Sequence, residues 1–325
     1  SKLKDIEAAL QGRVSKNSAL RNYQQEHLAH IAVQRAMVNR LKAEPTLNIC
    51  SQEFLCWLHE SFYQRLPAAL SVALTVSGKK ILLVPGALRD RAVRVGVHEP
   101  PTGRQDIQRC LAQFSKQFNP DCLSASQKLL ALAATHHRFL WIHPFADGNG
   151  RVARLFTLAY MVKCGLDIRL WTVARAMARD RGTYDRYLMM ADQARQGDLD
   201  GRGPLSEKGL RGFCHYFLSI CLDQIRYMAG CLELEQFEQR YHRHLLRLAQ
   251  EKSLSRGGGL LVQRLVRDGK LARGLVRDLC QVQERRANQI VKEVLQEGLA
   301  TSPTPRGPLF LHIDPDSAVA VFPRI

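Results

Sequence analysis

The chain has 325 residues, of which 46% are hydrophobic, and its 47 basic and 30 acidic side chains give a net charge of +17. This apolar content is ample for the cores of two or three domains. The sequence excludes a membrane span and a disulfide framework, because no run approaches about 20 apolar residues and the nine cysteines are scattered without a Cys-x-x-Cys pair. The absence of such pairs also argues against a zinc site, and the charged start Ser1–Lys4 does not resemble a signal peptide, so a reducing cytoplasm is the expected setting.

The first 75 residues are predicted to form an N-terminal helical lobe. Amphipathic runs cover Glu26–Lys42 and Gln52–Leu66, and they are broken at Pro45 and Pro67. A core domain is expected to follow over residues 76–240.

The core begins with β-favouring runs within residues 79–101. Pro85-Gly86 and Pro100-Pro101 punctuate these runs, which predicts a β-hairpin. Taken alone, the pattern fits a purely structural hairpin equally well. A helix is expected next, near Ser124–Phe139.

The stretch after this helix carries an anion-binding pattern. Gly148 and Gly150 permit unusual backbone dihedrals and close approach to a ligand, and Asn149 between them tolerates a left-handed conformation and offers an amide. An apolar helix is predicted from Gly148 to Lys163, so its N-terminal amides and dipole would face a phosphate. Arg151 and Arg154 are three residues apart and therefore share a face of that helix.

Two more residues complete a phosphate-transfer site. Asp147 stands just before the glycines and could hold magnesium, which prefers carboxylates and phosphate oxygens. His143 is the group here that titrates near neutral pH, and so is the candidate base. Each piece alone has an ordinary interpretation as a loop histidine or a tight turn, but their coincidence at a helix start favours nucleotide transfer. Neither a Walker motif nor a Gly-x-Gly-x-x-Gly motif after a strand occurs.

At every fixed position, His143–Arg154 resembles the signature of the Fic (filamentation induced by cyclic AMP) family, His-Pro-Phe-x-Asp/Glu-Gly-Asn-Gly-Arg-x-x-Arg. The resemblance implies a mainly helical fold and transfer of AMP from ATP to a hydroxyl side chain of a target protein. It also implies that Phe145 points into the core and anchors the loop.

The resemblance assigns the other roles residue by residue. His143 would deprotonate the attacking hydroxyl, and Asp147 would hold Mg²⁺. The turn Gly148-Asn149-Gly150 would cradle the α- and β-phosphates, while Arg151 and Arg154 would bind the β- and γ-phosphates.

The segment 79–101 resembles the flap of the same family, a β-hairpin that begins with Pro-Gly-x-x-Arg and ends with Pro-Pro. In that role Val93, Arg94 and Val95 would clamp the target peptide through their backbone groups by strand addition.

Tyr184 and Tyr187 resemble the aromatic residues that flank adenine in many family members. Helix packing is an equally good interpretation of both.

Many members of the family also carry an inhibitory helix of the form Ser/Thr-x-x-x-Glu-Gly/Asn, whose glutamate pairs with the second arginine of the signature. The stretch Asn17–Asn22 is similar, but Arg21 stands where the glutamate would be, and Glu26 could be a displaced substitute. A plain amphipathic helix is an equal alternative. The alignment predicts a site that is open to ATP and constitutively active.

A different module is expected over residues 241–325. A connector helix, Glu233–Lys252, precedes a breaker at Gly257-Gly258-Gly259, and a winged helix-turn-helix domain follows. Its expected elements are helices at Leu260–Asp268, Leu271–Cys280 and Glu284–Glu297, and strands at Leu299–Thr301 and Leu309–Leu311 flanking a wing at Pro303–Pro308.

In this module Arg285, Arg286, Asn288 and Gln289 would read DNA from the recognition helix. Residues 241–325 carry 14 basic and 8 acidic residues, or +6, which leaves +11 for the rest of the chain. Because the charge is spread over the whole chain, it supports DNA binding only weakly, and the module could instead serve in dimerisation or target docking.

The predicted fold class is therefore mainly α, a Fic-type helical core with a small β-hairpin flap and a C-terminal winged helix-turn-helix domain. The predicted function is protein adenylyltransferase, with ATP and Mg²⁺ as cofactors, a protein hydroxyl as acceptor and no membrane partner. The alternatives are a DNA-associated regulator in which the Fic site is secondary, another nucleotide transfer, phosphocholine transfer, or hydrolytic removal of AMP. A homodimer is compatible with the sequence.

Overall fold

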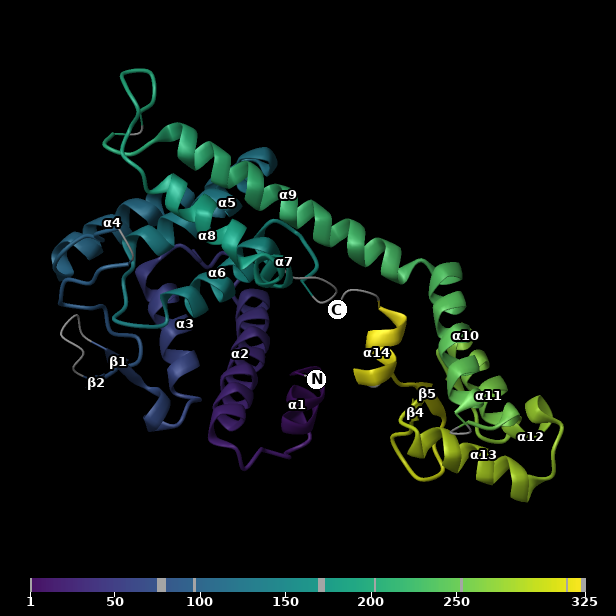
Figure 1. Ribbon diagram of the computed structural model, residues 1–325. Coiled ribbons are helices and arrows are strands. Elements are labelled where there is room, and N and C mark those ends of the chain that lie inside the picture. Colours follow the sequence, from purple (N-terminus) through teal and green to yellow (C-terminus); the bar gives the residue numbers. More distant parts are fainter. Residues whose placement is uncertain are drawn as a thin grey trace. The chain divides into compact units, whose positions relative to one another are not determined.

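The computed structural model describes residues 2–74, 80–95, 98–168, 173–201, 203–251, 254–313 and 315–322 (Figure 1). The chain divides into two compact units within a long helix, between Ile225 and Arg226. The N-terminal unit comprises residues 8–225, and the C-terminal unit comprises residues 226–325 together with residues 1–7. Each has its own apolar core.

The N-terminal unit is mainly helical. Its helices, of which the first and last extend into the C-terminal unit, are α1 (Lys2–Leu10), α2 (Ser18–Ala43), α3 (Gln52–Tyr63), α4 (Arg104–Phe118), α5 (Ala125–Ile142), α6 (Asn149–Lys163), α7 (Val173–Arg179), α8 (Arg181–Ala191) and α9 (Glu207–Leu232). Short 3₁₀ turns lie at Ala68–Leu70 and Pro120–Cys122.

Helix α6 is the central element of this unit and is buried along most of its length. It packs against α2, α3 and α5 (Figure 1). Helices α2 and α3, which the sequence places in a separate lobe, contribute to the same apolar core as α5 and α6. The helix that begins at the predicted catalytic turn is thus held on several sides.

Side-chain caps explain where several helices begin. Asn17 accepts a hydrogen bond from the Leu20 backbone, so α2 starts eight residues before the amphipathic run that predicts it. Ser124 and Gln127 form a capping box at the start of α5, which continues three residues beyond the predicted end to Ile142.

The β-hairpin lies earlier in the chain than predicted. Strands β1 (Val72–Leu74) and β2 (Lys80–Leu82) pair antiparallel, with Val72 opposite Leu82. In the predicted flap, Val93 and Arg94 are not in a strand, and Val95 forms an isolated antiparallel bridge to His98. The expectation of a regular strand at Val93–Val95 is therefore wrong, because other contacts fix this segment, as described below.

The C-terminal unit combines helices with a small antiparallel sheet of order β3-β5-β4. Its elements after α9 are α10 (Leu234–Gln250), α11 (Arg256–Asp268), β3 (Lys270–Leu271), α12 (Leu275–Cys280), α13 (Glu284–Gln296), β4 (Ala300–Thr301), β5 (Leu309–Leu311) and α14 (Pro315–Val321). The predicted helix over Leu271–Cys280 is wrong in its first residues, because Lys270 and Leu271 pair with Phe310 and Leu309 in the sheet.

The triple glycine at 257–259 is not a breaker. It lies in the first turn of α11, where Ser255 caps the helix by accepting from the Gly258 backbone. A Cβ atom at Gly257 would collide with Ile290 of α13, so the glycine permits close packing of the two helices. Over the described residues, none of the helices is both long enough and apolar enough to cross a membrane.

Candidate nucleotide-binding site

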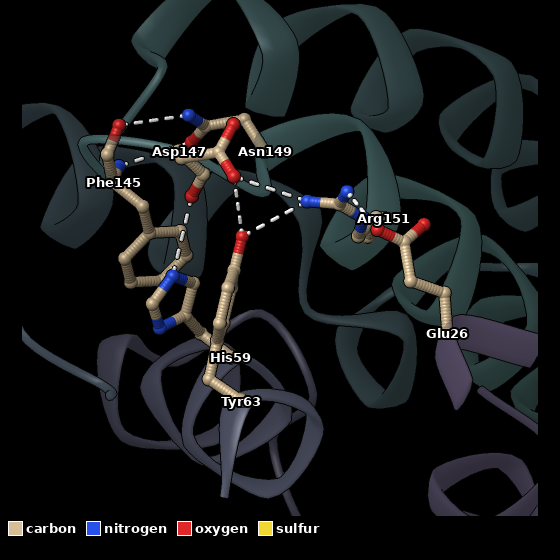
Figure 2. Close-up of polar contacts among 7 residues, drawn as sticks. All are labelled: Glu26, His59, Tyr63, Phe145, Asp147, Asn149 and Arg151. Carbon is tan, nitrogen blue, oxygen red and sulfur yellow. Dashed lines mark hydrogen bonds and ion pairs between the residues drawn. The ribbon is translucent and has the colours of Figure 1, made fainter. Parts of the chain in front are cut away.

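The predicted catalytic loop connects α5 to α6 and is braced from within. Phe145 is fully buried, and its backbone N–H donates to Asn149 Oδ1 at 3.0 Å while Asn149 Nδ2 donates back to the Phe145 carbonyl at 2.8 Å (Figure 2). The Asn149 side chain therefore holds the loop together. Its predicted contact with a phosphate stays a prediction, for which the second hydrogen of Nδ2 and the backbone N–H are the candidate donors.

The two glycines of the turn differ in their requirements. Gly148 caps α6 with φ +81°, and a Cβ atom there would lie 2.6 Å from the hydroxyl of Tyr63 on α3. Both the left-handed backbone and the packing demand glycine. Gly150 lies inside α6, where a Cβ atom would meet only Arg154 at 3.5 Å, so no steric need for glycine arises there within the described chain. It remains a position at which a ligand could approach the backbone.

Asp147 lies at the centre of a chain of polar contacts (Figure 2). Its Oδ2 accepts a 2.6 Å hydrogen bond from Tyr63 and a 3.0 Å bond from Arg151 Nη1, which also donates to the Tyr63 hydroxyl at 3.0 Å. The other end of the guanidinium donates to Glu26 of α2 at 2.8 Å. Burial and Asp147 both raise the pKa of Tyr63, so its hydroxyl remains a donor.

Helix α2 presents Glu26 and His30, one turn apart, to the two signature arginines. Burial, followed by the positive charge of Arg154, lowers the pKa of His30 to about 4. Glu26 and Arg151 are among the charges acting on Arg154, whereas Arg21 is exposed and is not among them. The structure thus gives the alignment of Arg21 with an inhibitory glutamate no support, and Glu26 is the α2 carboxylate that pairs with a signature arginine.

His143 ends α5 in a left-handed conformation, with φ 49° and ψ 58°. Its Nδ1 is buried, which leaves Nε2 as the nitrogen available to accept a proton. Burial, with smaller contributions from Arg89 and His98, lowers the pKa of His143 to about 4. The imidazole is thus neutral at physiological pH, as a general base must be. It lines a cavity of about 290 Å³ together with Ala73, Ile81, Ala146 and residues 89–94.

Arg89 fixes both the catalytic loop and the flap segment. Its side chain is 3% exposed and donates to the carbonyls of His143 (2.7 Å), Arg91 (2.8 Å) and Pro101 (2.7 Å). Its backbone N–H donates to the Pro144 carbonyl at 2.9 Å. One buried guanidinium therefore joins the two ends of the flap to the loop that carries the candidate base. Residues 91 and 101, on either side of Val93 and Arg94, are thus held by side-chain hydrogen bonds.

The two predicted adenine-flanking tyrosines are held differently. Tyr184 donates to His136 Nε2 at 2.9 Å, and His136 Nδ1 donates to Thr157 at 2.7 Å, since the Thr157 hydroxyl itself donates to a helix carbonyl. Tyr187 instead stacks on Tyr216, with ring centroids 4.6 Å apart. Tyr184 is thus tethered beside the signature helix, whereas the Tyr187 ring stacks on a residue of α9.

Sequence reasoning missed the α3 contribution. His59 and Tyr63 contact the loop from a helix more than 80 residues away in the chain, and no local sequence pattern predicts this contact. Arg89 was visible only as the last residue of Pro-Gly-x-x-Arg, without a role. The one available signal on α3 was the spacing of His59 and Tyr63, which are four residues apart and so share a helix face.

A magnesium ion would find one open carboxylate oxygen here. Among the described residues Asp147 Oδ1 has no partner, and no group of three or more His, Cys, Asp or Glu side chains stands ready to hold a metal. This donor set fits a cation that shares its ligands with a nucleotide's phosphates, because magnesium typically takes one or two carboxylates plus phosphates and water.

Residues 49–161 match the Fic/DOC family. This part of the chain is therefore similar to Fic domains. The matched segment includes His59, Tyr63 and the whole signature, whereas Glu26, Tyr184 and the C-terminal unit lie outside it.

Curated relatives and solved structures resemble parts of the chain. The chain is 34% identical over 114 residues to the "Protein adenylyltransferase Fic" of Drosophila erecta and equally to that of Drosophila melanogaster. Each alignment covers 35% of this chain and 21% of the relative. A Fic domain containing signaling protein from Bacteroides thetaiotaomicron shares the fold, with a TM-score of 0.50 and 18% identity over 70% of this chain and 78% of that chain.

Proposed function

We propose that the protein transfers AMP from Mg-ATP to a hydroxyl side chain of a target protein. The observation that carries this proposal is the loop between α5 and α6, which gathers His143, Asp147 and the N-terminus of α6 in the order of the Fic signature. The relatives that match this segment are named protein adenylyltransferases.

In this reaction the target oxygen attacks the α-phosphorus of ATP. A bond from that oxygen to phosphorus forms, the bond to the β-phosphate bridging oxygen breaks, and pyrophosphate leaves. His143 Nε2 takes the hydroxyl proton, and the α6 amides with Arg151 and Arg154 bind the phosphates. Magnesium, when bound through Asp147, would neutralise phosphate charge. Tyr184 is the aromatic residue placed beside the signature helix, and we assign Tyr187 to the same adenine side.

Labelled ATP tests this function directly. Label on the α-phosphate should appear on protein, label on the γ-phosphate should not, and His143→Ala should lower the rate by about 10² to 10⁴-fold. Arg151→Ala and Asp147→Ala should weaken use of Mg-ATP. Ala146→Ser, at the variable signature position, is the control and should change little.

The alternatives predict other patterns. Transfer of γ-label, or release of AMP from a premodified target without labelling, would replace the adenylyltransferase proposal. Transfer at full rate by His143→Ala would remove His143 from the role of base.

The C-terminal unit supports a second candidate function, binding to DNA. Helix α12, a turn of three residues with Gln281 in the left-handed region (φ 52°), and α13 follow the order of a helix-turn-helix. Exposed polar residues line the start of α13, namely Arg285, Arg286, Asn288 and Gln289. We propose that this face of α13 contacts the major groove.

Replacing Arg285 and Arg286 by alanine should weaken duplex binding and flatten its dependence on salt by roughly one unit per lost phosphate contact, without changing ATP chemistry. Electrophoretic shifts over a range of salt concentrations measure both. If the intact protein shifts no duplex even at low salt, dimerisation or target docking replaces DNA binding.

A further inference from the structure

Two residues one turn apart on α3 hold the same signature residue. His59 is 1% exposed and stacks on Phe145 at 4.1 Å between ring centroids. Its Nδ1 accepts from the Gly86 backbone at 2.8 Å, so Nε2 carries the proton and donates to the Asp147 carbonyl at 3.2 Å (Figure 2). Both ring nitrogens are used, and burial keeps the imidazole neutral by lowering its pKa to about 4.

Tyr63 holds the side chain of the same aspartate. Its hydroxyl donates to Asp147 Oδ2 at 2.6 Å, and its ring occupies the space that a Cβ atom on Gly148 would fill. The glycine is therefore needed for Tyr63 to reach the carboxylate. Asp147 is fixed at its backbone by His59 and at one carboxylate oxygen by Tyr63, and Oδ1 remains for a cation.

We propose, resting on the proposed function, that His59 and Tyr63 are positioning residues for Asp147 and set the affinity of the nucleotide site for its divalent cation. A carboxylate that must hold a metal through one oxygen is oriented by hydrogen bonds to the other, and loss of such an outer partner typically weakens metal binding about 10 to 100-fold. His59 also joins Gly86 at the start of the flap segment to this aspartate, so the loop and the flap share one anchor.

Tyr63→Phe tests the proposal, with Tyr160→Phe as a matched control. Tyr160 is a fully buried tyrosine on α6 whose hydroxyl donates to the Phe118 carbonyl at 2.9 Å. Each change removes one hydroxyl and keeps the ring. We expect Tyr63→Phe to raise the Kd for Mn²⁺ about tenfold in the protein saturated with AMPPNP. Tyr160→Phe should leave this Kd unchanged. Calorimetry and electron paramagnetic resonance of Mn²⁺ measure both.

Tyr63 also contacts Arg151, so AMPPNP binding without metal is measured as well. That affinity reports the loss at Arg151, and the ratio of affinities with and without Mn²⁺ reports Asp147. An equal ratio in wild type, Tyr63→Phe and Tyr160→Phe would overturn the proposal.

His59 provides a second test. His59→Phe keeps the ring stack but removes both hydrogen bonds, whereas the amide of His59→Gln can still donate to the Asp147 carbonyl. We expect Mn²⁺ affinity to fall in the first variant and to recover partly in the second. No difference between the two would exclude His59 from the positioning role. Because these readouts need no target protein, failure of AMP transfer and failure of cation binding are distinguishable.

Discussion

Arg151 meets a nucleotide with part of its guanidinium already engaged. Nη1 donates to Tyr63 and Asp147, and Nη2 donates to Glu26, so three of the five N–H groups have protein acceptors. Phosphate oxygens compete for the same donors, and Glu26 adds negative charge on the side from which α2 approaches. The side chains of Arg151 and Glu26 are about a third exposed, so water screens their ion pair. The pair therefore contributes about 1 kcal/mol or less to stability.

Removing the negative charge at position 26 should therefore favour nucleotide binding. Glu26→Gln keeps the size of the side chain and removes its charge, so we expect the KM for Mg-ATP to fall and transfer at low ATP to rise about two- to fivefold. Arg21→Glu and Arg21→Ala should change transfer little, because Arg21 is exposed and no described hydrogen bond or ion pair joins it to Arg154. Steady-state rates over a range of ATP concentrations measure each effect.

Glu44→Gln is the control, since Glu44 pairs with Arg40 at the other end of the same helix, at 3.2 Å. Reduced transfer by Glu26→Gln would mean that Glu26 orients Arg151 for catalysis and does not compete with phosphate.

Which contacts of the site could be predicted from the sequence depends on how far apart the two partners lie in the chain. His143, Asp147 and the signature arginines could be identified because the motif compresses a site into a dozen residues. The partners of Asp147 and Arg151 could not, since Tyr63 and Glu26 lie 84 and 125 residues away in the chain. The contacts by which Asn149 holds Phe145 could not be predicted either, because they depend on the path of the loop.

At the scale of elements, periodicity located helices well and their ends poorly. Helix α2 extends to its Asn17 cap, and the glycines at 257–259 continue α11 because α13 packs closely there. Glycine is a breaker in isolation and a packing residue when a neighbouring helix approaches. The strand pair of the hairpin lies at 72–74 and 80–82, earlier than predicted, while Arg89 holds the carbonyls of residues 91 and 101 by side-chain hydrogen bonds.

The glycines of α11 separate these two effects. Gly257→Ala should destabilise the C-terminal unit by roughly 1–3 kcal/mol, because its methyl group would overpack against buried Ile290. Gly259→Ala meets nothing within 4 Å and should stabilise α11 by about 0.5–1 kcal/mol. Hydrogen exchange of peptides from α11 and α13 measures both changes. Stabilisation by both substitutions would show that α11 and α13 are not closely packed at this point.

At the scale of the whole molecule, the N-terminal unit buries several neutral histidines around its site. Burial lowers the pKa of His30, His59 and His143 to about 4 each, and that of His136 to about 3. All four lie within residues 8–225, as do the three tryptophans, at positions 57, 141 and 171. Tryptophan fluorescence therefore follows the unfolding of this unit without a contribution from the other.

These histidines predict a stability that depends on acid. Above pH 6.5 they are neutral in both the folded and the unfolded chain, so they add no pH dependence. Below pH 6.5 the unfolded chain binds protons that the folded unit does not, and each histidine lowers the free energy of unfolding by up to about 1.4 kcal/mol per pH unit until its folded pKa is reached. With a typical stability of about 5–15 kcal/mol, the unit should lose most of its stability between pH 6.5 and 4.

Urea unfolding followed by tryptophan fluorescence at several pH values measures the slope of the free energy of unfolding against pH. His59→Gln removes one of these groups and should reduce the slope by up to about 1.4 kcal/mol per pH unit. His215→Gln, at an exposed position of α9, is the control and should leave the slope unchanged. A free energy of unfolding that stays constant from pH 7 to 5 would show that these imidazoles bind protons in the folded state, and His143 would then be charged at a pH where a base must be neutral.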